Sequence, residues 1–180
     1  MLVNIVKADI ETFRLHQGRV LDIYMETATS GVMQQTLSRD TELKYMLGLF
    51  EADGHGYLAF DGGNLIGFML SGALGHDDLL PGTVRERFPV DRCYYISEMH
   101  VAKEYQGKGI GSQMMQKCLD EIDRHRWDYL FIRAWKENEG ALKLYQRFGF
   151  KLDEIIEQEK IKKDRSSTFI IQKQYLWKKL

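Results

Sequence analysis

The chain has 180 residues, and its formal net charge of -1 at pH 7 argues against general nucleic-acid binding, which needs a basic surface. Its length suits one domain, so we expect residues 1–180 to form a single domain with a sizeable core. No apolar run has the length of a membrane span, and the first ten residues lack the features of a signal peptide. We therefore expect a cytoplasmic protein that does not bind membranes.

The first half of the chain predicts two helices followed by a hairpin. Apolar residues recur at helical spacing from Asp9 to Ala28, with Asp9 as a candidate N-cap, and again from Thr41 to Ala52. Strands are expected at Tyr57 to Asp61 and at Leu65 to Leu70. The turn between them contains Gly62-Gly63, which suits the positive φ angles of a tight hairpin.

The segment from Gly75 to Arg92 lacks the apolar periodicity of the preceding elements and contains both prolines of the chain, Pro81 and Pro89. It is either a long surface connection or a lid that contacts substrate, because long loops are often functional. The sequence leaves these two interpretations open.

The two cysteines, Cys93 and Cys118, do not have the spacing of metal ligands. We expect both to be small buried hydrophobic residues and not reactive thiols. The sequence therefore predicts no metal site.

The second half predicts alternating strands and helices. The expected strands are Tyr94 to Val101, Tyr129 to Trp135, Phe150 to Glu157 and Thr168 to Trp177. The expected helices run from Ser112 to His125 and from Asn138 or Glu139 to Phe148, with Asn138 as N-cap and Gly149 just past the end. We interpret the charged run Glu159 to Arg165 as a solvated connection.

A glycine-rich loop, Gln106-Gly-Lys-Gly-Ile-Gly-Ser112, joins a strand to a helix. Glycine permits unusual backbone angles and lets a ligand approach the main chain. The first N–H groups of a helix have no internal partner and carry partial positive charge, so such a loop is suited to bind an anion. The loop predicts a site for a phosphate or pyrophosphate.

Two common phosphate motifs do not fit this loop. A Walker P-loop needs Lys-Ser or Lys-Thr directly after its last glycine, and Gly111 is followed by Ser112 and Gln113. The dinucleotide fingerprint needs a third glycine where Ser112 stands, and it follows the first strand of its fold. The pattern that remains is Gln106-x-x-Gly109-x-Gly111.

This pattern resembles the phosphate-binding motif of the GNAT superfamily of N-acetyltransferases. The run Asn138 to Phe150 is similar to the second signature of that family, and both motifs occur in the family's order. One departure is Lys103, where many relatives carry proline. The resemblance implies an α/β fold with a mixed, mostly antiparallel central sheet, flanked by helices, whose fourth and fifth strands splay apart.

The resemblance also implies acetyl-CoA, or another form of coenzyme A, as co-substrate. Its pyrophosphate is expected on the backbone of the glycine loop, and its pantetheine arm beside the main chain of Met99 and Val101. Lys108 either adds charge near the phosphates or is a solvated loop residue. The implied cofactor-binding residues are Met99, Val101, Gln106, Gly107, Lys108, Gly109, Ile110, Gly111, Ser112, Asn138 and Tyr145.

Tyr145 is the implied proton donor to the departing thiolate, a role that a phenol can fill chemically. Asn138 and Tyr145 are seven residues apart, so helix geometry places them on nearly the same face. The alternative is that Tyr145 is a core aromatic residue and Asn138 only a cap.

Glu98 is the candidate base that removes a proton from the acceptor amine. Strand alternation predicts Glu98 and His100 on one face and Ser97 and Met99 on the other. His100 is thus a second candidate base. The alternative, that Glu98 is an ordinary strand residue near the acceptor and not a base, is equally open.

Together these features predict an N-acetyltransferase in which a primary amine, on a small molecule or a peptide, attacks acetyl-CoA directly. The alternative is a catalytically silent acyl-CoA sensor, but a sensor needs neither Glu98 nor Tyr145. The resemblance implies that the acceptor contacts the segment from Tyr24 to Leu37, the loop Gly75 to Arg92 and the last strands. The resemblance also makes a homodimer an open option.

Overall fold

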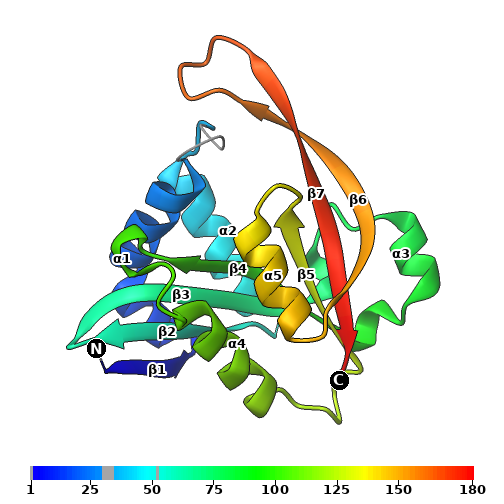
Figure 1. The fold of residues 1–180 in the computed structure, drawn as a ribbon, viewed down its shortest axis with the longest axis horizontal. Coiled ribbons are helices and arrows are strands. Elements are labelled where there is room, and N and C mark those ends of the chain that lie inside the picture. Colours follow the sequence, from blue (N-terminus) through cyan, green and yellow to red (C-terminus); the bar gives the residue numbers. More distant parts are fainter. Residues whose placement is uncertain (1, 30–34, 52) are drawn as a thin grey trace.

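The computed structural model describes residues 2–29, 35–51 and 53–180, which form one seven-stranded sheet in the order β1-β2-β3-β4-β5-β7-β6 (Figure 1). The strands are β1 (Val3–Ala8), β2 (His55–Asp61), β3 (Asn64–Ala73), β4 (Cys93–Val101), β5 (Tyr129–Trp135), β6 (Lys151–Ile161) and β7 (Thr168–Lys179). Among these strands the β4–β5 pair is parallel and every other neighbouring pair is antiparallel. The expected mixed, mostly antiparallel sheet is confirmed.

Helices cover both faces of this sheet (Figure 1). They are α1 (Ile10–Ala28), α2 (Arg39–Glu51), α3 (Gly82–Arg87), α4 (Ile110–Glu121) and α5 (Glu139–Arg147). One apolar cluster joins α1 and α2 to the sheet around Phe13 and Phe68. A second cluster, around Met115 and Leu130, joins α4 and α5 to the other face. Among the described residues, no helix is both long and apolar enough to cross a lipid bilayer.

The local capping signals are confirmed. The Asp9 side chain accepts a hydrogen bond from the Thr12 N–H at 2.8 Å, as an N-cap does. Asn138 caps α5 in the same way, accepting from the Ala141 N–H at 3.1 Å. Gly149 follows α5 with a φ of +82°, in the left-handed region that glycine adopts readily.

Some element boundaries differ from those expected. Strand β1 was not foreseen; it pairs antiparallel with β2 at the sheet edge. Helix α4 begins at Ile110 and stops at Glu121, where the extended backbone of Ile122 ends it. Strand β6 continues to Ile161 and so includes the start of the charged run at Glu159. Ala52, the expected end of the second helix, lies outside the described residues.

Strands β4 and β5 separate partway along their length, and Figure 1 shows the resulting opening. They pair only from Cys93 with Tyr129 to Ile96 with Ile132. Beyond that point β4 stays with β3 and β5 stays with β7. The splay implied for the fourth and fifth strands is confirmed.

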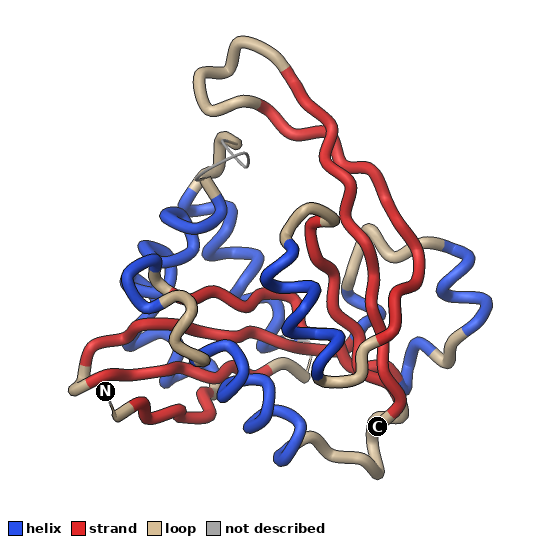
Figure 2. The backbone as a smooth tube through the Cα atoms, in the orientation of Figure 1, coloured by secondary structure: helices blue, strands red, loops and turns tan. Residues whose placement is uncertain are grey.

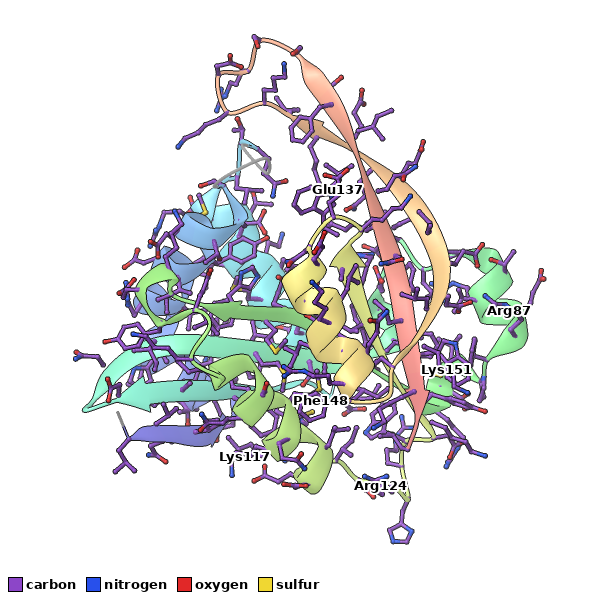
Figure 3. The ribbon with its side chains drawn as sticks, viewed as in Figure 1. Arg87, Lys117, Arg124, Glu137, Phe148 and Lys151 are labelled. Carbon is purple, nitrogen blue, oxygen red and sulfur yellow. The ribbon has the colours of Figure 1, made fainter. Side chains whose placement is uncertain are left out.

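The loop 75–92 is a folded part of the structure. It contains α3, and its Leu80 and Val84 side chains are buried in a small third cluster with residues of β5 and β7. Arg87 of α3, labelled in Figure 3, donates to Asp153 at 2.8 Å and thereby ties α3 to β6. The residues at the beginning of the loop also line a cavity that is described below.

Candidate active site

The glycine loop presents a row of unpaired backbone donors. The six N–H groups from Gly107 to Ser112 make no hydrogen bond within the described part of the chain; the first bond of the helix runs from the Gln113 N–H to the Gly109 carbonyl. Gly107 and Gly109 have φ angles of +74° and +81°. These angles turn the chain so that the donors precede α4, where the helix dipole also favours an anion.

Gly111 serves a different purpose from the two turn glycines. A Cβ atom at this position would lie 3.3 Å from Cδ2 of Leu144, so the missing side chain allows α4 and α5 to approach closely. On the outer side of the loop, Lys108 lies 4.9 Å above the Tyr105 ring and is exposed. Arg147 Nη2 lies 3.4 Å from Ser112 Oγ, which places another cation beside the loop.

The edge of β4 that faces the opening has main-chain N–H groups that can donate hydrogen bonds to a ligand. The Ala102 N–H donates to Ile66 of β3, so by alternation the N–H groups of Met99 and Val101 point toward the opening. The Val101 carbonyl already accepts from Gln106 Nε2 at 2.9 Å. Gln106 therefore ties the glycine loop to the strand where the pantetheine arm was expected.

A cavity of about 470 Å³ lies in this opening, and we call it the cofactor cavity. Its walls include Glu98 to Val101, Gln106 and Asn138, which brings five of the twelve predicted site residues together. Glu137, labelled in Figure 3, lines it from the β5–α5 connection. Gln35 also lines it; its side-chain oxygen is buried and has no hydrogen-bond partner among the described residues.

Glu98 and His100 lie on the same face, as predicted. His100 Nε2 is 2.8 Å from Glu98 Oε2, and His100 Nδ1 is 2.6 Å from Thr27 Oγ1. The His100 ring stacks on Phe68 with their centroids 5.3 Å apart. The imidazole is thus held between α1 and the carboxylate.

The predicted placement of Ser97 opposite Glu98 is wrong. The register of β3 and β4 shifts so that Leu70 pairs with Glu98 and Ser71 with Ile96, which makes Ser97 the extra residue of a β-bulge. The Ser97 hydroxyl contacts the Tyr45 hydroxyl of α2. Met99 packs in the cluster of the opposite face, as predicted. The bulge therefore turns two successive side chains toward α1 and α2.

Tyr145 is buried in the core beneath α5, with 5% of its surface exposed. Its ring centroid lies 6.0 Å from that of Phe150, and its hydroxyl has no hydrogen-bond partner among the described residues. Burial, and then the charge of Glu98, raise the pKa of the Tyr145 phenol. The phenol therefore stays protonated, although the ring is not part of either cavity wall described here.

A second cavity of about 330 Å³, which we call the acceptor cavity, adjoins the first. Tyr24, Glu98 and Lys173 line both cavities and mark where they meet. Glu42 and Lys160 line the acceptor cavity but not the cofactor cavity. Burial raises the pKa of Glu42, and burial lowers the pKa of Lys160.

Sequence reasoning missed the two lysines. Lys160 belongs to the charged run that was interpreted as a solvated connection, yet it is half-buried in the strand β6. Lys173 is half-buried in β7, where burial and then the charge of Arg133 lower its pKa to about 8. Alternation along the long hairpin was the available signal, because every second residue of each strand faces the same side.

Both cysteines are buried, as expected. Burial raises the pKa of Cys93 and of Cys118 to about 12. Both therefore remain thiols at neutral pH, and neither suits a covalent acyl-transfer step.

Residues 19–150 match the model of the acetyltransferase (GNAT) family. A probable spermine N(1)-acetyltransferase of Bacillus subtilis subsp. natto is 28% identical over 92 residues, 51% of this chain and 55% of that protein. N-alpha-acetyltransferase 30 of Schizosaccharomyces pombe is 32% identical over 56 residues, 31% of this chain and 37% of that protein. The matched stretch thus spans about half or less of these relatives.

Two solved structures share the fold over nearly the whole chain. An N-acetyltransferase from Staphylococcus aureus has a TM-score of 0.73 at 18% identity, with 99% of each chain covered. A Salmonella typhimurium protein solved with acetyl-CoA has a TM-score of 0.73 at 15% identity, with 100% of this chain and 95% of that chain covered. At these identities the likeness concerns the fold alone.

Proposed function

Because the chain belongs to the GNAT family of acetyltransferases, we propose that it transfers an acetyl group from acetyl-CoA to a primary amine. The observation that carries this proposal is the row of six unpaired N–H groups from Gly107 to Ser112, next to an opening that contains Glu98. Relatives named for spermine and for N-alpha-acetylation keep both small molecules and peptides open as acceptors.

The residues present fit coenzyme A. The loop from Gln106 to Ser112 would hold the diphosphate through main-chain donors, with Lys108 and Arg147 adding positive charge beside it. The N–H groups of Met99 and Val101, and the side chain of Asn138, face the arm's expected position. When bound, the thioester supplies an acyl carbon that an amine can attack.

In this proposal Glu98 accepts the proton of the amine. Its Oε2 is engaged by His100, while its Oε1 has no hydrogen-bond partner among the described residues and remains available to a substrate. His100, held by Thr27, is then a positioning residue that fixes the carboxylate between the two cavities. This geometry favours Glu98 over His100 as the base.

Tyr145 is the proposed proton donor to the departing sulfur. Two features support the role: a hydroxyl without a partner in the described structure, and closeness to Glu98 sufficient for that charge to affect the pKa of Tyr145. A phenol hydroxyl without a protein partner can donate a hydrogen bond to a ligand. The bound cofactor is a natural partner.

The first test is binding followed by turnover. Coenzyme A at 100 times its dissociation constant stabilises a fold by about 2.7 kcal/mol, which thermal unfolding detects easily. Thiol release from acetyl-CoA in the presence of an amine panel then measures catalysis. Stabilisation with no thiol release from any amine would favour the silent sensor, and no stabilisation at all would refute both functions.

A further inference from the structure

Two carboxylates and two ammonium groups that line the acceptor cavity come from different pairs of elements. Glu42 and Glu98 come from α2 and β4, whereas Lys160 and Lys173 come from β6 and β7; Asp77 and Asp78, from the loop after β3, line the cavity as well. Figure 1 shows that these pairs of elements stand on opposite sides of the opening. From this arrangement, and resting on the proposed function, we propose that the acceptor is a small zwitterion with an amine and a carboxylate, such as an α-amino acid.

The amine end is assigned to the side of Glu98. This carboxylate lines both cavities, so an amine beside it is next to the expected thioester. Glu42 lies on the same side; after burial and the charge of Glu98, its charge contributes to raising the pKa of Tyr24, a residue that lines both cavities. An ammonium group approaching from solvent would therefore meet negative charge near the reaction point.

The anionic end is assigned to Lys160. Neither Lys160 nor Lys173 has a carboxylate within 4.0 Å among the described residues, so neither ammonium is neutralised by an ion pair. Arg133 is also at this cavity, but it is paired with Asp77 at 2.9 Å and that charge is offset. Burial, and then the charge of Arg133, lower the pKa of both lysines, and a bound carboxylate would favour their charged forms.

The size and closure of the cavity favour a small acceptor. Its volume of about 330 Å³ is at the lower end of ligand pockets. The hairpin tip is joined to the α1–α2 connection: the Thr36 N–H donates to the Ile161 carbonyl at 3.0 Å and the Thr36 hydroxyl to Lys162 at 2.9 Å. Figure 2 shows the long β6–β7 hairpin reaching over this side of the molecule. A polyamine with one amine beside Glu98 would bring its other positive charges close to Lys160 and Lys173, and the like charges would repel.

The test compares acceptors that differ only in the carboxylate. Thiol release is measured with L-leucine, L-phenylalanine and L-methionine, with the amine that each yields on decarboxylation, and with spermidine. We expect kcat/KM for at least one amino acid to exceed that for its decarboxylated partner by about tenfold or more, as one lost charged contact requires. The variant Lys160→Gln should reduce this ratio at least about fivefold.

Lys163→Gln is the matched control, since Lys163 lies in the exposed turn of the same hairpin and lines neither cavity. It should keep the full preference for the amino acid. Equal use of both members of every pair, or a preference for spermidine, would overturn the zwitterion inference but leave the acetyltransferase intact. A ratio unaffected by Lys160→Gln would overturn the assigned role of Lys160. Absence of thiol release with every acceptor would overturn the proposed function itself.

Discussion

The substitution Gly109→Ala tests the anion site most directly. Gly109 has a φ of +81°, and a Cβ atom added there would have no neighbouring atom within 4 Å. Alanine at this position would therefore destabilise the fold through backbone strain and not through a clash. That strain is about 1–2 kcal/mol for a residue with a side chain. In a domain of this size it corresponds to a fall in Tm of about 2–8 °C.

The effect on binding should exceed the effect on stability. If the strained turn relaxes, the N–H groups around Gly109 leave their common orientation, and each lost bond to a phosphate costs about 1.5–3 kcal/mol. We expect coenzyme A to bind roughly tenfold or more weakly, measured by isothermal titration calorimetry. Pantetheine, which lacks the diphosphate, should bind the variant and the parent protein alike.

Gly111→Ala is the control for this experiment. Its added Cβ would meet Leu144 Cδ2 at 3.3 Å, and this end of a flexible side chain can move by a few tenths of an ångström. Gly111 has no positive φ, so the turn itself is unaffected. The reasoning is refuted if Gly109→Ala lowers Tm but binds coenzyme A normally, or if it weakens pantetheine and coenzyme A equally.

Four further outcomes are expected. Tyr145→Phe should lower kcat at least about tenfold with coenzyme A affinity unchanged, as for a group that acts only in the transition state; equal kcat would leave Tyr145 a packing residue. Glu98→Gln should lower kcat most at neutral pH and less above pH 9, where more of the amine is already deprotonated; a parallel pH profile contradicts a base. Asp77→Asn leaves buried Arg133 without its carboxylate and should cost about 3–5 kcal/mol in thermal unfolding, more than Asp77→Asn combined with Arg133→Met. Burial lowers the pKa of His55 from 6.5 to about 4. The stability that the neutral ring contributes is therefore complete above pH 6.5 and is lost as the pH falls through 4. In urea titrations, His55→Gln should flatten the dependence of the unfolding free energy on pH, and an unchanged dependence contradicts this reasoning.

The features that sequence predicted well depend on a few neighbouring residues. The caps at Asp9 and Asn138, the turn at Gly62 and the start of the glycine loop are set by local backbone geometry, and the structure has all of them. The pairing of Glu98 with His100 also followed from simple alternation.

The features that sequence missed depend on distant partners. The bulge at Ser97 arises from the register of β3 against β4, and nothing within the strand itself marks it. Lys160 and Gln35 reach the site only because the hairpin tip pairs with the α1–α2 connection, 126 residues apart along the chain. Long-range register of this kind has no signature in local periodicity.

The separation of β4 from β5 creates both a problem and a binding surface. Main-chain donors and acceptors on a strand without a neighbour need partners, and an unpaired edge invites unwanted strand addition. Here Gln106 Nε2 fills one such position by bonding the Val101 carbonyl, which leaves the N–H groups of Met99 and Val101 to face the cavity. An amide-bearing ligand would complete this edge as a strand does. Because Gln106 also begins the glycine loop, its bond to Val101 ties the edge of β4 to the N–H groups of that loop, where the diphosphate is proposed to bind.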